Sequence, residues 1–145
     1  MREKDCPFCK IIRGEEKAEI IFEDDLVTAF LHIAPVNDGH ILLVPQQHQG
    51  GASGLSTEYL HRLMEVAPKI ASVTMRAVKA EGYNILLSNG ACAGQMVQHA
   101  CVHIIPRFPD DGVILPTFAG SANRLPPDEA KGLGQKVKRK LSTRL

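Results

Sequence analysis

The sequence predicts an α+β domain in which an antiparallel sheet of about five strands carries a long helix and a C-terminal helix on one side. Short apolar or alternating segments bounded by Gly, Pro, Asn and Asp indicate the strands. One long segment has the apolar spacing of an amphipathic helix. The chain has 145 residues, of which 44% are hydrophobic and 23% are charged. This size suffices for one core but not for two full domains, so we expect a single domain over residues 1–145.

Three strands are expected in the first third of the chain. Residues 18–23 and 27–32 are separated by a two-residue polar turn, so a hairpin is the simplest connection. Residues 35–39 contain Pro, Asn, Asp and Gly and therefore indicate a loop. Residues 40–45 are a short apolar run closed by a proline, which is typical of a buried strand.

A long helix is expected next. Ser56 is a suitable N-cap, and the carboxylate of Glu58 suits the first turn. From Leu60 to about Ala80, apolar residues recur at three and four positions. We expect Pro68 to kink or locally break this helix because proline lacks the backbone donor for the preceding turn.

The rest of the chain predicts two strands and a helix. Residues 83–88 form the fourth strand, and the loop at residues 90–94 leads into the fifth. The last helix spans about residues 127–141 and starts with a proline, which the first turn tolerates.

The fifth strand carries the most informative side chains. Because strand side chains alternate between faces, His99, Cys101 and His103 share one face. The opposite face consists of the apolar residues Ala100, Val102 and Ile104. This pattern indicates an active-site strand above a buried backing, and the alternative is a half-buried strand with two incidental histidines.

Cysteine spacing predicts a metal site. The four cysteines have no secretion signal before them, which favours reduced thiols or metal binding over disulfides. Cys6 and Cys9 form a Cys-x-x-Cys pair that can grip a tetrahedral metal from a tight turn. A redox dithiol is disfavoured because no strand can precede the pair. His48 and His99 would complete a Cys2His2 set, with thiols that bind no metal as the alternative.

Charge and hydropathy exclude several classes of partner. The formal net charge is +1, and the first basic run is at residues 136–140, so we expect no nucleic-acid partner. No segment approaches the ~18 apolar residues of a membrane span, and no apolar signal region begins the chain. We therefore expect a cytoplasmic protein without a membrane partner.

The chain resembles the histidine-triad (HIT) family of nucleotide-binding hydrolases and transferases, whose signature is His-x-His-x-His followed by two apolar residues. Cys101 stands where the family has its middle histidine. The resemblance runs from Cys6 to about Arg107 and includes Phe30, Leu31, Pro35, Gly39, His40, Pro45, His48, Gly94, Gln95, Val97 and Pro106. It implies a HIT-like fold, a homodimer, and hydrolysis of nucleoside phosphates or phosphoramidates.

The resemblance also implies structural zinc. In the Cys-x-x-Cys subgroup, the positions of Cys6, Cys9, His48 and His99 hold the metal. A closed site with four protein ligands would organise the N-terminus rather than activate water. Cys101 is a weaker rival ligand, because same-face neighbours in a strand lie ~6.6–6.8 Å apart.

A nucleotide pocket follows from the same resemblance. It implies that Gln95 and His103 contact the phosphate or the leaving group, with help from the Gly94 backbone. The positions that match nucleotide-contacting residues are Phe22, Phe30, Leu31, His32, Ile33, Ser88, Asn89, Gly94, Gln95, Met96 and His103. The departures from the family pattern are His32 for Asp or Asn, Ser88 for Asn, Met96 for Ser, and Cys101. Their gathering in one pocket favours a natural, diverged member, in which ribose recognition is weaker or altered.

Cys101 occupies the position of the family's nucleophile. In the family, the middle histidine attacks the α-phosphate and carries the nucleotidyl group. A thiolate can attack phosphorus, and His103 could lower the pKa of this thiol. However, a cysteine sulfur lies roughly 1.5–2 Å nearer its own Cα than a histidine Nε2, and a ~1 Å misplacement costs about 10²-fold. We therefore expect a hydrolase of reduced activity. The alternatives are a non-catalytic nucleotide or anion sensor, a dimeric scaffold, and a thiol-dependent phosphoryl transferase.

Overall fold

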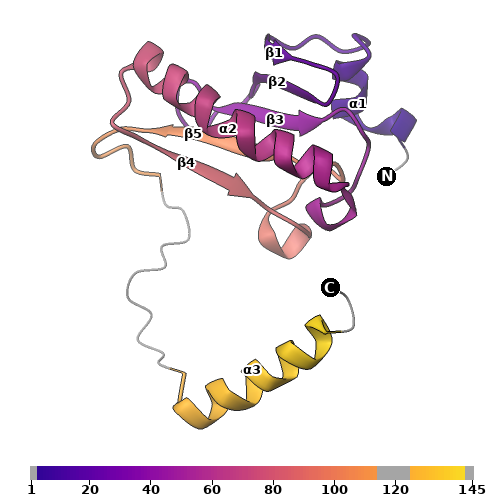
Figure 1. The fold of residues 1–145 in the computed structure, drawn as a ribbon. Helices are drawn as coiled ribbons and strands as arrows, with labels where there is room; N and C mark the ends of the chain where they lie inside the picture. Colours follow the sequence, from indigo (N-terminus) through magenta and orange to yellow (C-terminus); the bar gives the residue numbers. More distant parts are fainter. Residues whose placement is uncertain (1–2, 114–124, 143–145) are drawn as a thin grey trace. The chain divides into compact units, whose positions relative to one another are not determined.

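Five strands form one antiparallel sheet in the computed structural model, which describes residues 3–113 and 125–142. The strands are β1 (Ile20–Glu23), β2 (Val27–Leu31), β3 (Ile41–Pro45), β4 (Gly82–Leu87) and β5 (Val102–Arg107). Their order in the sheet is β1-β2-β3-β5-β4, and every neighbouring pair is antiparallel (Figure 1). The predicted α+β class is confirmed.

The β1–β2 hairpin is held by its polar turn. The Asp24 carboxylate accepts hydrogen bonds from the backbone N–H groups of Leu26 at 2.8 Å and Val27 at 2.9 Å. Arg62 of the long helix pairs with the same carboxylate at 2.7 Å. An aspartate that bonds the backbone two and three residues ahead stabilises a turn, so the sequence correctly located this one.

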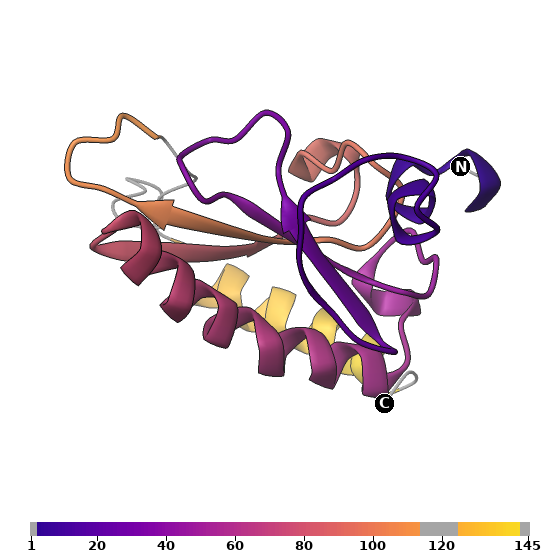
Figure 2. The same cartoon turned by 90° about the horizontal axis from the view of Figure 1, so that it is seen from above.

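Helix α2 (Thr57–Val78) covers one face of the sheet (Figure 2). It buries Leu63, Val66, Ala67 and Ala71 against the apolar side chains of β2, β3 and β5. Ser56 is its N-cap, as predicted. The helix continues through Pro68, so this residue does not end or divide it. Packing of the apolar stripe, rather than any single backbone hydrogen bond, stabilises such a helix.

The opposite face of the sheet carries helix α1 (Pro7–Ile12), which the sequence analysis missed. Phe8, Ile11 and Ile12 of α1 pack against a second apolar cluster, formed by Phe30, Leu42, Val44 and Cys101. Six residues are too few to show a helical period, and we expected only a tight turn here.

The strand β5 begins later than predicted. His99 and Cys101 precede it, because the Ala100 N–H donates to the carbonyl of Gln49 at 2.6 Å instead of joining the ladder. The predicted alternation nevertheless holds. Ala100 and its apolar partners at 102 and 104 enter the core under α2, whereas Cys101 belongs to the cluster on the α1 face.

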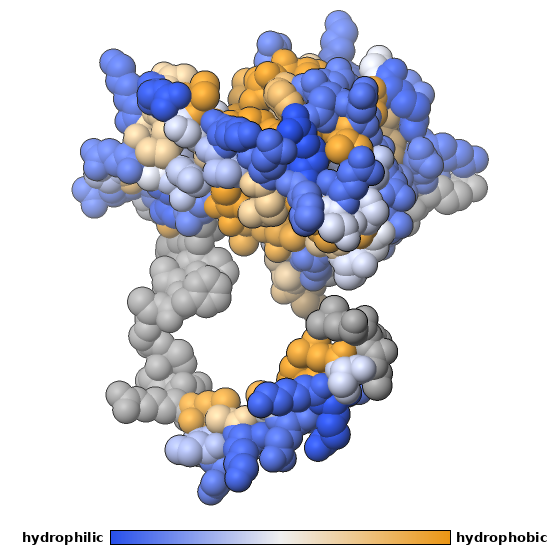
Figure 3. All heavy atoms as spheres, in the orientation of Figure 1, coloured by the Kyte–Doolittle hydropathy of each residue, from blue (hydrophilic) through white to orange (hydrophobic). Residues whose placement is uncertain are grey.

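The chain divides into two compact units, residues 1–112 and 113–145. The second unit contains helix α3 (Pro127–Leu141), with the predicted bounds. Leu133, Val137 and Leu141 are exposed on α3 beside its basic residues (Figure 3). The single domain over residues 1–145 stays a prediction. Within the described ranges, no helix is long and apolar enough to cross a membrane.

Candidate functional site

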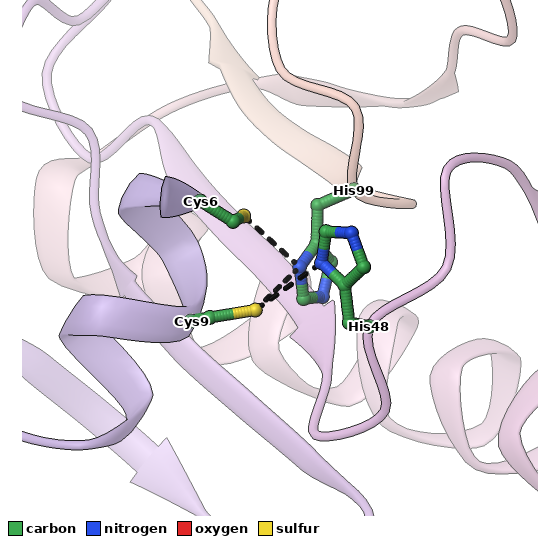
Figure 4. A group of neighbouring side chains, drawn as sticks. All are labelled: Cys6, Cys9, His48 and His99. Atoms are coloured by element: carbon green, nitrogen blue, oxygen red, sulfur yellow. Dashed lines mark hydrogen bonds between the residues drawn. The ribbon is translucent and has the colours of Figure 1, made fainter. Parts of the chain in front are cut away.

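Four potential metal ligands from three separate segments converge (Figure 4). Cys6 precedes α1 and Cys9 lies within it, while His48 follows β3 and His99 precedes β5. One ligand atom from each of the four residues lies within 4.8 Å of all the others. The predicted ligand set is therefore assembled by the fold, and we call it the metal cluster.

The spacing of the cluster suits a tetrahedral ion. The Cys9 Sγ atom lies 3.2 Å from Nδ1 of His48 and 3.5 Å from Nδ1 of His99. The Cys6 Sγ atom lies 3.5 Å from the same His99 nitrogen. Bonds of about 2.3 Å to sulfur and 2.0–2.1 Å to nitrogen would place tetrahedral S and N ligands about 3.5–3.6 Å apart. The donor set and its spacing thus fit zinc.

The surroundings prepare these groups for a metal. His99 is fully buried, and its Nε2 donates to the Pro45 carbonyl at 2.9 Å, which leaves Nδ1 as the acceptor that faces the cysteines. Burial lowers the pKa of His99, so its ring is neutral. Burial and the neighbouring Cys6 raise the pKa of the Cys9 thiol to about 12. Metal binding at neutral pH would therefore release this proton.

A cavity of about 1060 Å³ adjoins the metal cluster. Its lining includes these predicted site residues: Phe30, Leu31, His32, Ile33, Ser88, Gly94, Gln95, Met96, Cys101 and His103. It also includes Pro7, Phe8 and Ile11 of α1, together with Ile20, none of which we predicted. The metal ligand His99 contributes to the same wall.

The structure places two predicted pocket residues elsewhere. The pairing of β1 with β2 shifts between Ile20 and Phe22, so Ile20 pairs with Phe30 and Phe22 pairs with Ala29. Phe22 consequently packs against the core under α2, with the guanidinium of Arg62 at 5.9 Å from its ring centroid. The Asn89 Oδ1 accepts a hydrogen bond from the backbone N–H of residue 52 at 2.8 Å.

Two hydrogen bonds define the tautomers of His40, which is buried, and of His103, which lines the cavity. The Val36 N–H donates to Nδ1 of His40 at 3.2 Å, so Nε2 of His40 carries the proton. This Nε2 lies 3.1 Å from Nδ1 of His103 and donates to it. The Nε2 of His103 must then carry a proton, which makes it a donor for a ligand. We did not predict a site role for His40, because its hydrogen bond to the cavity residue His103 joins positions 63 residues apart in the sequence.

A third histidine packs against this pair. The ring of His32 stacks on His40 with centroids 4.6 Å apart, and its Nδ1 accepts from the Ala34 N–H at 2.9 Å. Burial, followed by the proximity of His32 and His103, lowers the pKa of His40 to about 4. Burial likewise lowers the pKa of His32 and His103. At neutral pH these three histidines are therefore neutral, and they offer N–H donors rather than fixed positive charges.

Cys101 is a buried thiol, 7% exposed. Burial raises its pKa to about 12. The expectation that His103 could lower the pKa of this thiol is wrong, since a neutral imidazole does not offset the loss of solvent. The Cys101 thiol is therefore protonated at neutral pH.

The amide of Gln95 is bonded to the backbone. Its Oε1 accepts from the Gly90 N–H at 2.8 Å, and its Nε2 donates to the Gly50 carbonyl at 2.6 Å. The same Nε2 lies 3.4 Å from the carbonyl of His99. Gln95 thus joins the cavity wall to the two segments that carry the histidine ligands.

Comparisons with known proteins agree with this architecture. The HIT domain model matches residues 13–110. An adenosine 5'-monophosphoramidase of Schizosaccharomyces pombe is 36% identical over 139 residues, which cover 94% of this chain and 98% of that protein. A HIT family protein of Bacillus subtilis superposes with a TM-score of 0.85 at 31% identity and 97% coverage of both chains. A zinc-bound histidine triad protein of Mycobacterium smegmatis superposes with a TM-score of 0.69 at 28% identity, with 91% of each chain covered.

The resemblance carried by the His-x-Cys-x-His row and the Cys-x-x-Cys pair is therefore confirmed at the level of family, and the chain belongs to the histidine-triad (HIT) family.

Proposed function

We propose that this protein binds a nucleoside phosphate in the cavity and hydrolyses nucleoside phosphates or phosphoramidates at a reduced rate. The observation that carries the proposal is the neutral His40–His103 pair, which directs an N–H donor to a ligand. Apolar side chains such as Phe8 and Phe30 suit a planar base beside it. The adenosine 5'-monophosphoramidase of Schizosaccharomyces pombe supports this class of substrate.

The chemistry divides between a retained donor and a weakened nucleophile. The Nε2–H of His103 stabilises charge on the transferring phosphate or on its leaving group. The Cys101 thiol, whose pKa burial raises to about 12, stays protonated at pH 7 and is therefore a poor nucleophile. Its short reach adds to this loss. Slow turnover is the expected consequence.

A non-catalytic nucleotide or anion sensor is the second candidate. The buried Cys101 thiol favours it, because binding needs only the donors of the cavity. A dimeric scaffold without a ligand is a third possibility, and a phosphoryl transferase that uses the Cys101 thiol is disfavoured by the raised pKa.

Calorimetry with adenosine 5'-monophosphate (AMP) tests the cavity. We expect binding of modest affinity to the zinc-loaded protein, and a loss of at least about 10-fold in the His103→Ala variant, since a hydrogen bond to a charged group is removed. The exposed His61 of α2 provides the control, and His61→Ala should leave the affinity unchanged. Absence of binding at millimolar AMP would contradict both the hydrolase and the sensor and leave the scaffold.

We also propose that the metal of the cluster is zinc, held by Cys6, Cys9, His48 and His99 in a structural role. The S-to-N spacing supports this assignment, and so does the zinc-bound relative from Mycobacterium smegmatis. Four protein ligands leave no position for a water molecule, so zinc would anchor α1 and the segment before β5. Cys101 packs in the apolar cluster with Phe30 and does not belong to the metal cluster.

A homodimer completes the proposal. The strand β4 lies at an edge of the sheet, and Tyr83 and Leu87 on it are exposed. A second copy that covers this surface would protect the edge strand. The balanced charge supports a small-molecule partner rather than a nucleic acid, and a cytoplasmic location is part of the proposal.

Light scattering should give twice the chain mass of 15.8 kDa. The double variant Tyr83→Glu and Leu87→Glu on β4 should shift the protein to a monomer, because charges would then face each other across the contact. The control is Val36→Glu, at an exposed valine in the loop between β2 and β3. A monomeric parent protein at tens of micromolar would contradict the dimer.

A further inference from the structure

The metal cluster and the cavity are built from the same segments. Helix α1 contributes Cys9 to the cluster and Phe8 to the cavity. The segment before β5 contributes His99 to both. A metal that holds these segments together would therefore also shape the cavity wall.

Phe8 is the first link. It lies between the two cysteine ligands in the sequence, and its ring centroid is 5.8 Å from that of His99 and 5.7 Å from that of Phe30. A six-residue helix such as α1 is not stable by itself in water. The ion pair between Lys10 and Glu16 is solvent-exposed and contributes little. The place of Phe8 therefore depends on apolar packing and on whatever binds the cysteines.

Gln95 is the second link. Its amide bridges the carbonyl of Gly50, two residues after the ligand His48, and the N–H of Gly90, at the start of the glycine-flanked turn that borders the cavity. Its Nε2 also approaches the carbonyl of His99. A change in the ligand segments would therefore displace this turn.

We propose that metal binding at the cluster and ligand binding in the cavity are thermodynamically coupled, with Phe8 and Gln95 as the physical links. The metal orders the cavity wall in advance, so the ligand no longer bears the ordering cost. By linkage, the ligand raises the metal affinity by the same factor. This inference rests on the proposed function, because the ligand is taken to be a nucleoside phosphate.

The coupling is measured from both sides. The zinc affinity is determined by competition with a chromophoric chelator, with and without saturating AMP, and the AMP affinity is determined with and without zinc. We expect each ligand to tighten the other by at least about 5-fold. Equal AMP affinities in the two metal states would overturn the inference alone. Absence of AMP binding to the zinc-loaded protein would overturn the proposed function together with it.

Variants separate this coupling from global stabilisation by zinc. Gln95→Ala should lose most of the coupling factor, measured in that variant as the ratio of its own zinc affinities with and without saturating AMP. Gln135→Ala, at an exposed glutamine of α3, should keep it. If zinc acts only by keeping the whole protein folded, AMP should raise the zinc affinity of Gln95→Ala by the same factor as in the parent. That result would overturn the proposal. Phe8→Leu, which keeps an apolar side chain, should reduce the coupling in part.

Discussion

The Cys101→His variant is expected to hydrolyse an adenosine phosphoramidate at least about tenfold faster than the parent chain. The donor at Nε2 of His103 and the backbone near Gly94 are retained, whereas a nucleophile of sufficient reach is missing. Cys101 borders the cavity, so a longer side chain at this position can extend into it. A neutral imidazole there is nucleophilic without losing a proton, whereas a thiol whose pKa burial raises to about 12 must first ionise.

Recovery should be incomplete, since His32, Ser88 and Met96 still alter the contacts with the substrate. Uniform loss of binding appears mainly in KM, so kcat and KM are measured separately. Both proteins are assayed at equal zinc content, and Cys101→Ser serves as the control that keeps the size of the parent residue.

Two results would reject this account of Cys101. If the parent is as fast as Cys101→His and Cys101→Ser abolishes the activity, the thiol is the nucleophile despite its burial. If neither protein has activity while AMP still binds, the sensor replaces the hydrolase as the function.

Loss of the metal should destabilise the protein strongly. Purified protein should contain one zinc per chain, and chelation or Cys9→Ser should lower the Tm by ~10 °C or more, because metal-binding free energy is coupled to folding. Cys9 contacts both histidine ligands, so its replacement removes a ligand that links α1 to both histidine segments.

The exposed Cys92 provides the matched control for this experiment. Cys92→Ser should retain zinc and the parent Tm. Metal analysis combined with calorimetric melting decides the matter. A zinc content near zero in protein that never met a chelator would refute the assignment, and so would an unchanged Tm after complete removal of the metal.

Local patterns in the sequence were enough for the sheet, for α2 and α3, and for the family. Alternation placed Val102 and Ile104 in the core and Cys101 opposite them even though β5 starts late. The Cys-x-x-Cys pair indicated a metal site, and the resemblance to the histidine-triad family added His48 and His99 to a ligand set that the fold brings together. These features are readable because periodicity and ligand spacing are properties of neighbouring residues.

The tertiary structure alone decided which predicted site residues meet. The register shift in β1 turned Phe22 into the core and left Ile20 in the cavity. The donor state of His103 depends on Val36 and His40, which come from elsewhere in the chain. Packing around Cys101 raised the pKa of its thiol. Both ends of the Gln95 amide form hydrogen bonds with the backbone, at Gly90 and Gly50. Register, burial and through-space hydrogen bonds arise only when distant segments pack, so no local pattern contains them.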